Sequence, residues 1–168
     1  MHRRTLLTLG VVSGAILAVA GTTIALIQPG RSAGRFTASG RALFTAVAQA
    51  VLGSLLPADA SARSAALAAH VARVEATIAG LPPHMQAEFD ELITVIGSAP
   101  GRFGLVGLTS DWAEADSAAV SEALESMRRS TLAVRQQAYH ALRDVTNGSY
   151  FADPSTWAAI GYPGAHAV

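Results

Sequence analysis

The side chains best suited to chemistry are the histidines, and their spacing does not build a metal site. No two of them stand three or four residues apart, the spacing that places two ligands on one helix face. His70 and His140 are therefore interpreted as solvated or hydrogen-bonded side chains. An enzyme that uses His140 or His84 with nearby carboxylates is a third hypothesis for the function. The complete set is His2, His70, His84, His140 and His166.

Other residue types that could carry chemistry are missing or wrongly placed. The chain has no cysteine, which excludes disulfides, thiolate zinc sites, iron–sulfur clusters, covalent c-type haem and cysteine nucleophiles. Gly101, Gly104 and Gly107 recur at three-residue spacing, but no strand is expected before them, so they do not predict a phosphate-binding loop. We expect no catalytic, cofactor-binding or metal-binding residues in this chain.

The charged residues predict helix ends and a solvated surface. Glu88, Asp90 and Glu91 fall early in an expected helix, where carboxylates interact favourably with the helix N-terminus. Formal net charge is zero, and the chain after its first acidic residue, Asp59, is net acidic. This distribution argues against nucleic-acid binding. A further group is spaced for ion pairs along one helix face: Glu122, Glu125, Arg128 and Arg129.

Apolar side chains at helical spacing predict an all-α fold, a small bundle of about four helices. Frequent alanines favour helices because alanine loses no side-chain entropy there. Asp111, with Glu114 three residues later, is typical of a helix cap. Residues 99–108 are expected to form a loop that buries apolar groups. The expected helices cover residues 43–55, 59 or 61 to 78, 83–97 and 120–147.

The first thirty residues resemble an export signal. Arg3 and Arg4 stand directly before Leu6, Leu7 and a long apolar stretch, which is the order of a twin-arginine signal. An ordinary secretory signal is one alternative. The apolar stretch also approaches the ~20 residues that span a bilayer, so an uncleaved membrane anchor is another. The predicted organisation is a signal or anchor at 1–30, a flexible linker at 31–40 and a helical domain at 41–168.

The tail after residue 149 differs from the helices before it. Four of its side chains are aromatic, and prolines and glycines interrupt the segment, so it is expected to be irregular. It either folds back on the bundle or contacts another protein, and we expect contact. The side chains predicted to anchor a partner are Trp112, Tyr150, Phe151, Trp157, Tyr162 and Pro163.

The tail also resembles a known family. Tyr150-Phe151-Ala152-Asp153-Pro154, followed by Trp157 and by Ile160-Gly161-Tyr162-Pro163-Gly164, is similar to the closing motif of the gluconate 2-dehydrogenase subunit 3 family. The resemblance implies a non-catalytic, gamma-type small subunit of a periplasmic, inner-membrane-associated dehydrogenase complex.

The same resemblance implies the partners. It implies a large GMC-type catalytic subunit that binds FAD, in some complexes a multihaem cytochrome c, and the twin-arginine translocase, with no cofactor bound by this chain. A small subunit that bears the signal would act like a chaperone, assisting folding and stability and carrying the folded partner out. The alternative is a stand-alone, membrane-anchored periplasmic helical domain.

Overall fold

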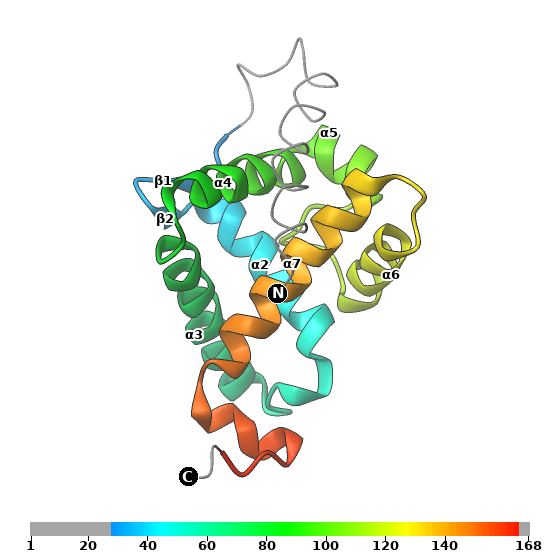
Figure 1. The fold of residues 1–168 in the computed structure, drawn as a ribbon. Coiled ribbons are helices and arrows are strands. Elements are labelled where there is room, and N and C mark those ends of the chain that lie inside the picture. Colours follow the sequence, from blue (N-terminus) through cyan, green and yellow to red (C-terminus); the bar gives the residue numbers. More distant parts are fainter. Residues whose placement is uncertain (1–27, 165–168) are drawn as a thin grey trace.

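The computed structural model describes residues 28–164, and this part of the chain is all-α, with five long helices (Figure 1). Residues 1–27, which contain the predicted export signal, lie outside the described part. The elements are β1 (Arg31–Ser32), β2 (Arg35–Phe36), α2 (Ala38–Leu52), η2 (Gly53–Leu55), α3 (Ala60–Ala79), α4 (Pro83–Gly97), α5 (Ala99–Gly101), η3 (Arg102–Val106), α6 (Ser117–Arg128), α7 (Ala133–Phe151) and η4 (Pro154–Ile160).

Helix α2 is the centre of the bundle and contacts α3, α4, α6 and α7. Its side chains Leu43, Phe44 and Val47 are completely buried. Burying an aliphatic or aromatic side chain of this size contributes about 2 kcal/mol to folding, so this one helix holds the others together. The partner helices supply further fully buried side chains: Val74, Ile78, Ile93, Ile96, Met127 and Leu142.

The predicted flexible linker at residues 31–40 is wrong. Strands β1 and β2 pair antiparallel, and the two residues between them, Ala33 and Gly34, both have positive φ angles, of 49° and 77°. Positive φ at both positions is typical of the tight turns that match the twist of a hairpin. Helix α2 begins directly afterwards, because the Thr37 side chain accepts the N–H of Gly40 and caps it.

An ion pair between a buried arginine and a half-exposed aspartate fastens this hairpin to α4. The Arg31 side chain is 1% exposed, and its Nη1 lies 2.6 Å from Oδ1 of Asp90. Its other terminal nitrogen donates to the carbonyl of Gly34. The helix-terminus interpretation of the acidic group at 88–91 is therefore wrong: α4 begins at Pro83 and has no acidic residue in its first turn. Asp90 instead neutralises a buried guanidinium.

The helix starts are partly as predicted. Asp59 caps α3 by accepting the backbone N–H three residues on, and Pro83 opens α4, which ends at Gly97 as expected. The prediction for Asp111 is wrong, because this residue begins a turn and the cap of α6 is Asp116. Both aspartates can accept local N–H groups, and only the second is followed by a helical apolar stripe.

The predicted single helix over residues 120–147 is two helices, α6 and α7. Ser130 interrupts it: its Oγ accepts the N–H of Leu132, a local bond that competes with helix propagation. Arg135 then ties the new helix to its surroundings, donating from Nε to the carbonyl of Leu105 and from Nη2 to Oγ of Ser126. Glu125 pairs with Arg128 and Arg129, as part of the predicted charged face.

The segment 99–108 is more regular than the predicted loop. It forms the short helix α5 and the π-helical turn η3. Val106 and Leu108 are buried, as the apolar composition predicts, whereas Phe103 is 68% exposed. The segment thus covers one end of the core and leaves one large ring in solvent.

Candidate interaction surface at the C-terminal end

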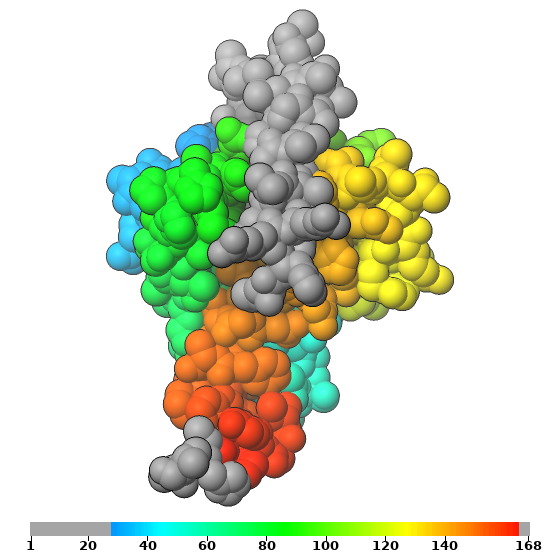
Figure 2. All heavy atoms as spheres, viewed as in Figure 1, coloured from blue at the N-terminus to red at the C-terminus, as the bar shows by residue number. Residues whose placement is uncertain are grey.

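Residues 152–164, named the C-terminal cap below, form one end of the molecule beyond α7 (red in Figures 1 and 2). The cap contains the 3₁₀ helix η4 and follows α7 without a flexible spacer. It contains most of the tail motif that the sequence analysis singled out. The packing of the cap determines which of the predicted anchor side chains are exposed and can contact a partner.

The end of α7 that carries the cap is bound to α3 and η2. The Tyr150 hydroxyl donates to the carbonyl of Leu55 at 3.0 Å, and Ser149 Oγ donates to Thr77 Oγ1 at 2.9 Å. Tyr150 also packs in a small second core with Leu52, Leu56 and Leu67. These contacts fix the position from which the cap starts.

Asp153 organises the first turn of the cap. Its side chain accepts both the N–H of Ser155, at 3.0 Å, and the hydroxyl of the same residue, at 2.7 Å. Its other carboxylate oxygen lies 3.2 Å from Nη1 of Arg73 on α3. The Ser155 hydrogen bonds, aided by the charge of Arg73, lower the pKa of Asp153. Pro154 follows at the first helical position, which suits a residue without an N–H.

Trp157 closes the cap on itself. Its Nε1 donates to the carbonyl of Phe151 at 2.7 Å, and its ring meets that of Tyr162 edge to face with centroids 5.1 Å apart. Gly161 makes this contact possible, since its φ of 70° turns the chain in a conformation that favours glycine. The Tyr162 N–H then donates to the carbonyl of Trp157.

The cap therefore presents a small apolar surface held by hydrogen bonds. Ile160 is 52% exposed and Tyr162 is 46% exposed, and Pro163 beside them is also exposed. Exposed large apolar side chains held in a fixed geometry are suited to binding another protein, because little side-chain entropy is lost on contact. This pair, Ile160 and Tyr162, is named the cap surface below.

Burial contradicts two of the six predicted anchors. Trp112 is 3% exposed and belongs to the main core, where its Nε1 donates to the carbonyl of Ile96. Tyr150 is 7% exposed and supports the cap from inside. Phe151 and Trp157 are half-buried, and Tyr162 and Pro163 are exposed. Ile160, which is part of the tail motif but was not predicted as an anchor, is exposed as well.

Within residues 28–164 the structure does not bring the histidines together, and His2 and His166 lie outside this range. His70 is completely buried on α3, with its ring 6.0 Å from that of Tyr150, while His84 and His140 are exposed. No group of three or more potential metal-ligating side chains occurs within residues 28–164. Within the same range no helix is long and apolar enough to cross a membrane. The apolar stretch before residue 28 lies outside the described residues.

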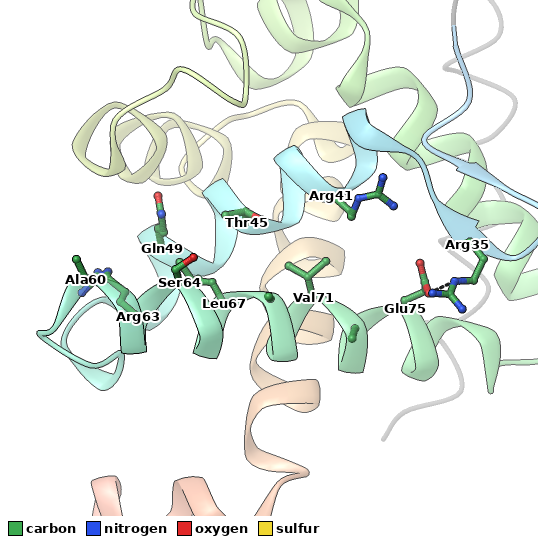
Figure 3. Close-up of a pocket in the computed structure, with 12 residues that line it drawn as sticks. Arg35, Arg41, Thr45, Gln49, Ala60, Arg63, Ser64, Leu67, Val71 and Glu75 are labelled. Carbon is green, nitrogen blue, oxygen red and sulfur yellow. Dashed lines mark ion pairs between the residues drawn. The ribbon is translucent and has the colours of Figure 1, made fainter.

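A groove between α2 and α3 was not anticipated from the sequence (Figure 3). It encloses about 490 Å³ and is lined in part by arginines at positions 35, 41 and 63. Positions 31–40 are predicted from the sequence to be a linker, and no sequence motif assigns a role to Arg41 or Arg63. The usable signal was the four-residue spacing of polar side chains at 41, 45 and 49 along α2.

Comparisons with known proteins add no relative. No protein-family model matches this chain, and neither a curated protein nor a solved structure matches it. The family resemblance therefore rests on the residues of the tail motif.

Proposed function

We propose that this protein is a non-catalytic small subunit that binds a larger, FAD-dependent dehydrogenase subunit through its C-terminal cap. The observation that carries the proposal is the cap surface: Ile160 and Tyr162 are about half exposed on a segment fixed by its own hydrogen bonds. Interfaces favour rigid aromatic and aliphatic anchors of this kind.

The construction of the cap supports the tail motif as a structural unit. Asp153 caps the turn, Trp157 closes it, and Gly161 supplies the left-handed backbone. Each of these motif residues serves to hold the exposed side chains in place. A tail motif that is similar to that of a known small subunit, and that ends in an exposed apolar pair, favours the accessory-subunit function over a purely internal role.

Export is the second half of the proposal. The large subunit would fold with FAD in the cytoplasm, bind the cap, and leave through the twin-arginine translocase on the signal of this chain at Arg3 and Arg4. The working location is the periplasm, at the inner membrane. A small protein that is expected to bind no cofactor has little need of a route for folded cargo on its own account, and this motivates the export role.

The double substitution Ile160→Ala and Tyr162→Ala is expected to weaken partner binding at least tenfold. Truncating central interface anchors costs on the order of 2 kcal/mol each. Both side chains are about half exposed, so the free energy of unfolding should fall by less than about 1 kcal/mol. The measurement is affinity purification of the tagged full-length protein from native membranes, with flavin absorption and the yield of the larger chain as readouts.

Phe103→Ala is the matched control, because Phe103 is 68% exposed and lies outside the cap. It should retain the partner as the unchanged protein does. A colourless monomer recovered from the unchanged protein would contradict the proposal and favour a stand-alone, membrane-anchored domain. Equal partner recovery with the double variant would show that the cap is not the interface.

Replacing both arginines of the signal with lysine, Arg3→Lys and Arg4→Lys, is expected to leave the large subunit in the cytoplasm. Twin-arginine export requires the arginine pair, and the partner is proposed to have no signal of its own. Cell fractionation with flavin and immunoblot readouts measures this. Normal export of the partner with this variant, or without this protein at all, would refute the carrier role.

A further inference from the structure

The groove between α2 and α3 has an apolar floor and a polar rim (Figure 3). The buried side chains Leu67 and Val71 form the floor, and Ala68 and Ala72 beside them are exposed. The exposed positions on α3 hold only small side chains, so the groove stays open. Another segment can therefore approach this face closely.

The rim of the groove is positively charged at both ends. Arg63 lies at one end, while Arg35 and Arg41 lie at the other. Among the described residues that line the groove, Glu75 is the one carboxylate. Both of its oxygens are in use: Oε1 lies 2.6 Å from Nε of Arg35, and Oε2 accepts the N–H of Phe36. The lining thus carries three guanidinium groups against one carboxylate.

Two of these guanidinium groups lack an acidic partner within the described part of the chain. Seven arginines of residues 28–164 form ion pairs there, whereas Arg41, Arg63 and Arg135 form none. Arg135 donates instead to two backbone carbonyls of η3 and to a serine hydroxyl of α6. Arg41 and Arg63 each donate one hydrogen bond to a backbone carbonyl. Arg41 is exposed and Arg63 is half-buried, and both line the groove.

We propose that the α2–α3 groove binds an acidic, amphipathic helix of a partner protein, with its apolar side chains on the floor and carboxylates at both ends. The length of the site supports a helix. Arg63 and Glu75 are separated by twelve positions on α3, or about 18 Å at 1.5 Å per residue. A single-headed small anion would meet the arginines at one end only. The inference does not depend on the partner of the cap.

Selection of random peptides tests the proposal without knowledge of the natural partner. A displayed library of peptides about 16 residues long, enough to span the groove as a helix, is panned against the full-length protein. We expect the selected peptides to carry Asp or Glu at both ends of an apolar helical stripe. Their affinity, measured by fluorescence anisotropy, should fall as salt is raised, because charge pairs are screened.

Two groove variants locate the site. Arg41→Glu combined with Arg63→Glu should weaken the selected peptides at least tenfold, and Ala68→Trp should block them by filling the exposed floor. Arg129→Glu combined with Arg143→Glu is the charge-matched control, since both side chains are exposed and lie outside the groove, and it should change affinity less than twofold. Circular dichroism of each variant confirms folding.

Three results would overturn the proposal. The first is that the selected peptides lack acidic residues. The second is that they bind equally well after the groove substitutions. The third is that no peptide binds and the groove arginines are required for binding to anionic phosphatidylglycerol vesicles. The last result would assign the groove to a lipid surface. None of these results depends on whether the cap binds a flavin subunit, so failure here and failure of the proposed function are distinguishable.

Discussion

Replacing Trp112 with alanine is expected to lower the free energy of unfolding by about 4 kcal/mol. The indole is 3% exposed within the main core, so its loss leaves a large cavity among the helices. Its Nε1 also donates to the carbonyl of Ile96 at 2.9 Å. That carbonyl is in the last turn of α4, where no helical N–H is available to it. Urea unfolding followed by far-ultraviolet circular dichroism measures the loss.

Two further substitutions separate the contributions and test the assignment to the core. Trp112→Phe keeps most of the ring and removes the N–H, so it should cost about 1 to 2 kcal/mol. Trp157→Ala, at a half-buried position in the cap, should cost less than Trp112→Ala. If Trp112→Phe instead weakened partner recovery with no change in stability, Trp112 would be an interface residue and its place in the core would be wrong.

Three of the five long helices could be predicted from the sequence. Helices α2, α3 and α4 follow from apolar spacing and strong punctuation, such as Pro83 at the start of α4. The break between α6 and α7 was missed because Thr131 and Val134 continue the helical spacing across it. A serine side chain that bonds a nearby N–H decides the break, and composition alone does not show whether that bond forms.

The sequence indicates which kind of side chain the candidate surface carries, but it only partly indicates which of these side chains are exposed. The tail was predicted to be irregular, and this is wrong for residues 154–160, which form the 3₁₀ helix η4. Aromatic character also does not distinguish a core ring from a surface ring. Trp112 and Tyr150 are buried because distant segments supply partners for their polar atoms, at Ile96 and Leu55. The groove arginines were missed for a related reason: α2 and α3 bring them together only after folding.

The unfolding free energy is expected to fall by about 3 kcal/mol as pH is lowered, through the single residue His70. Its ring is completely buried, and both ring nitrogens are without hydrogen-bond partners in the described part of the chain. Burial, with the nearby charge of Arg73, lowers the pKa of His70 from 6.5 to about 4. Below about pH 6.5 the unfolded chain therefore binds a proton on His70, whereas the folded chain does not. The free energy of unfolding falls progressively from there down to about pH 4.

Substitution with an apolar side chain of similar size isolates this effect. His70→Leu should be more stable than the unchanged protein by about 1 kcal/mol at about pH 7.5, because two unpaired polar atoms are removed. At about pH 5 the difference should grow by a further 2 kcal/mol or so, since only the unchanged chain has a histidine to protonate on unfolding. His140→Gln, at an exposed histidine, is the control, and its stability difference from the unchanged protein should be the same at both pH values. If the stability difference between His70→Leu and the unchanged protein were the same at both pH values, the folded protein would accept the proton on His70. The assignment of His70 as a buried neutral ring would then be wrong.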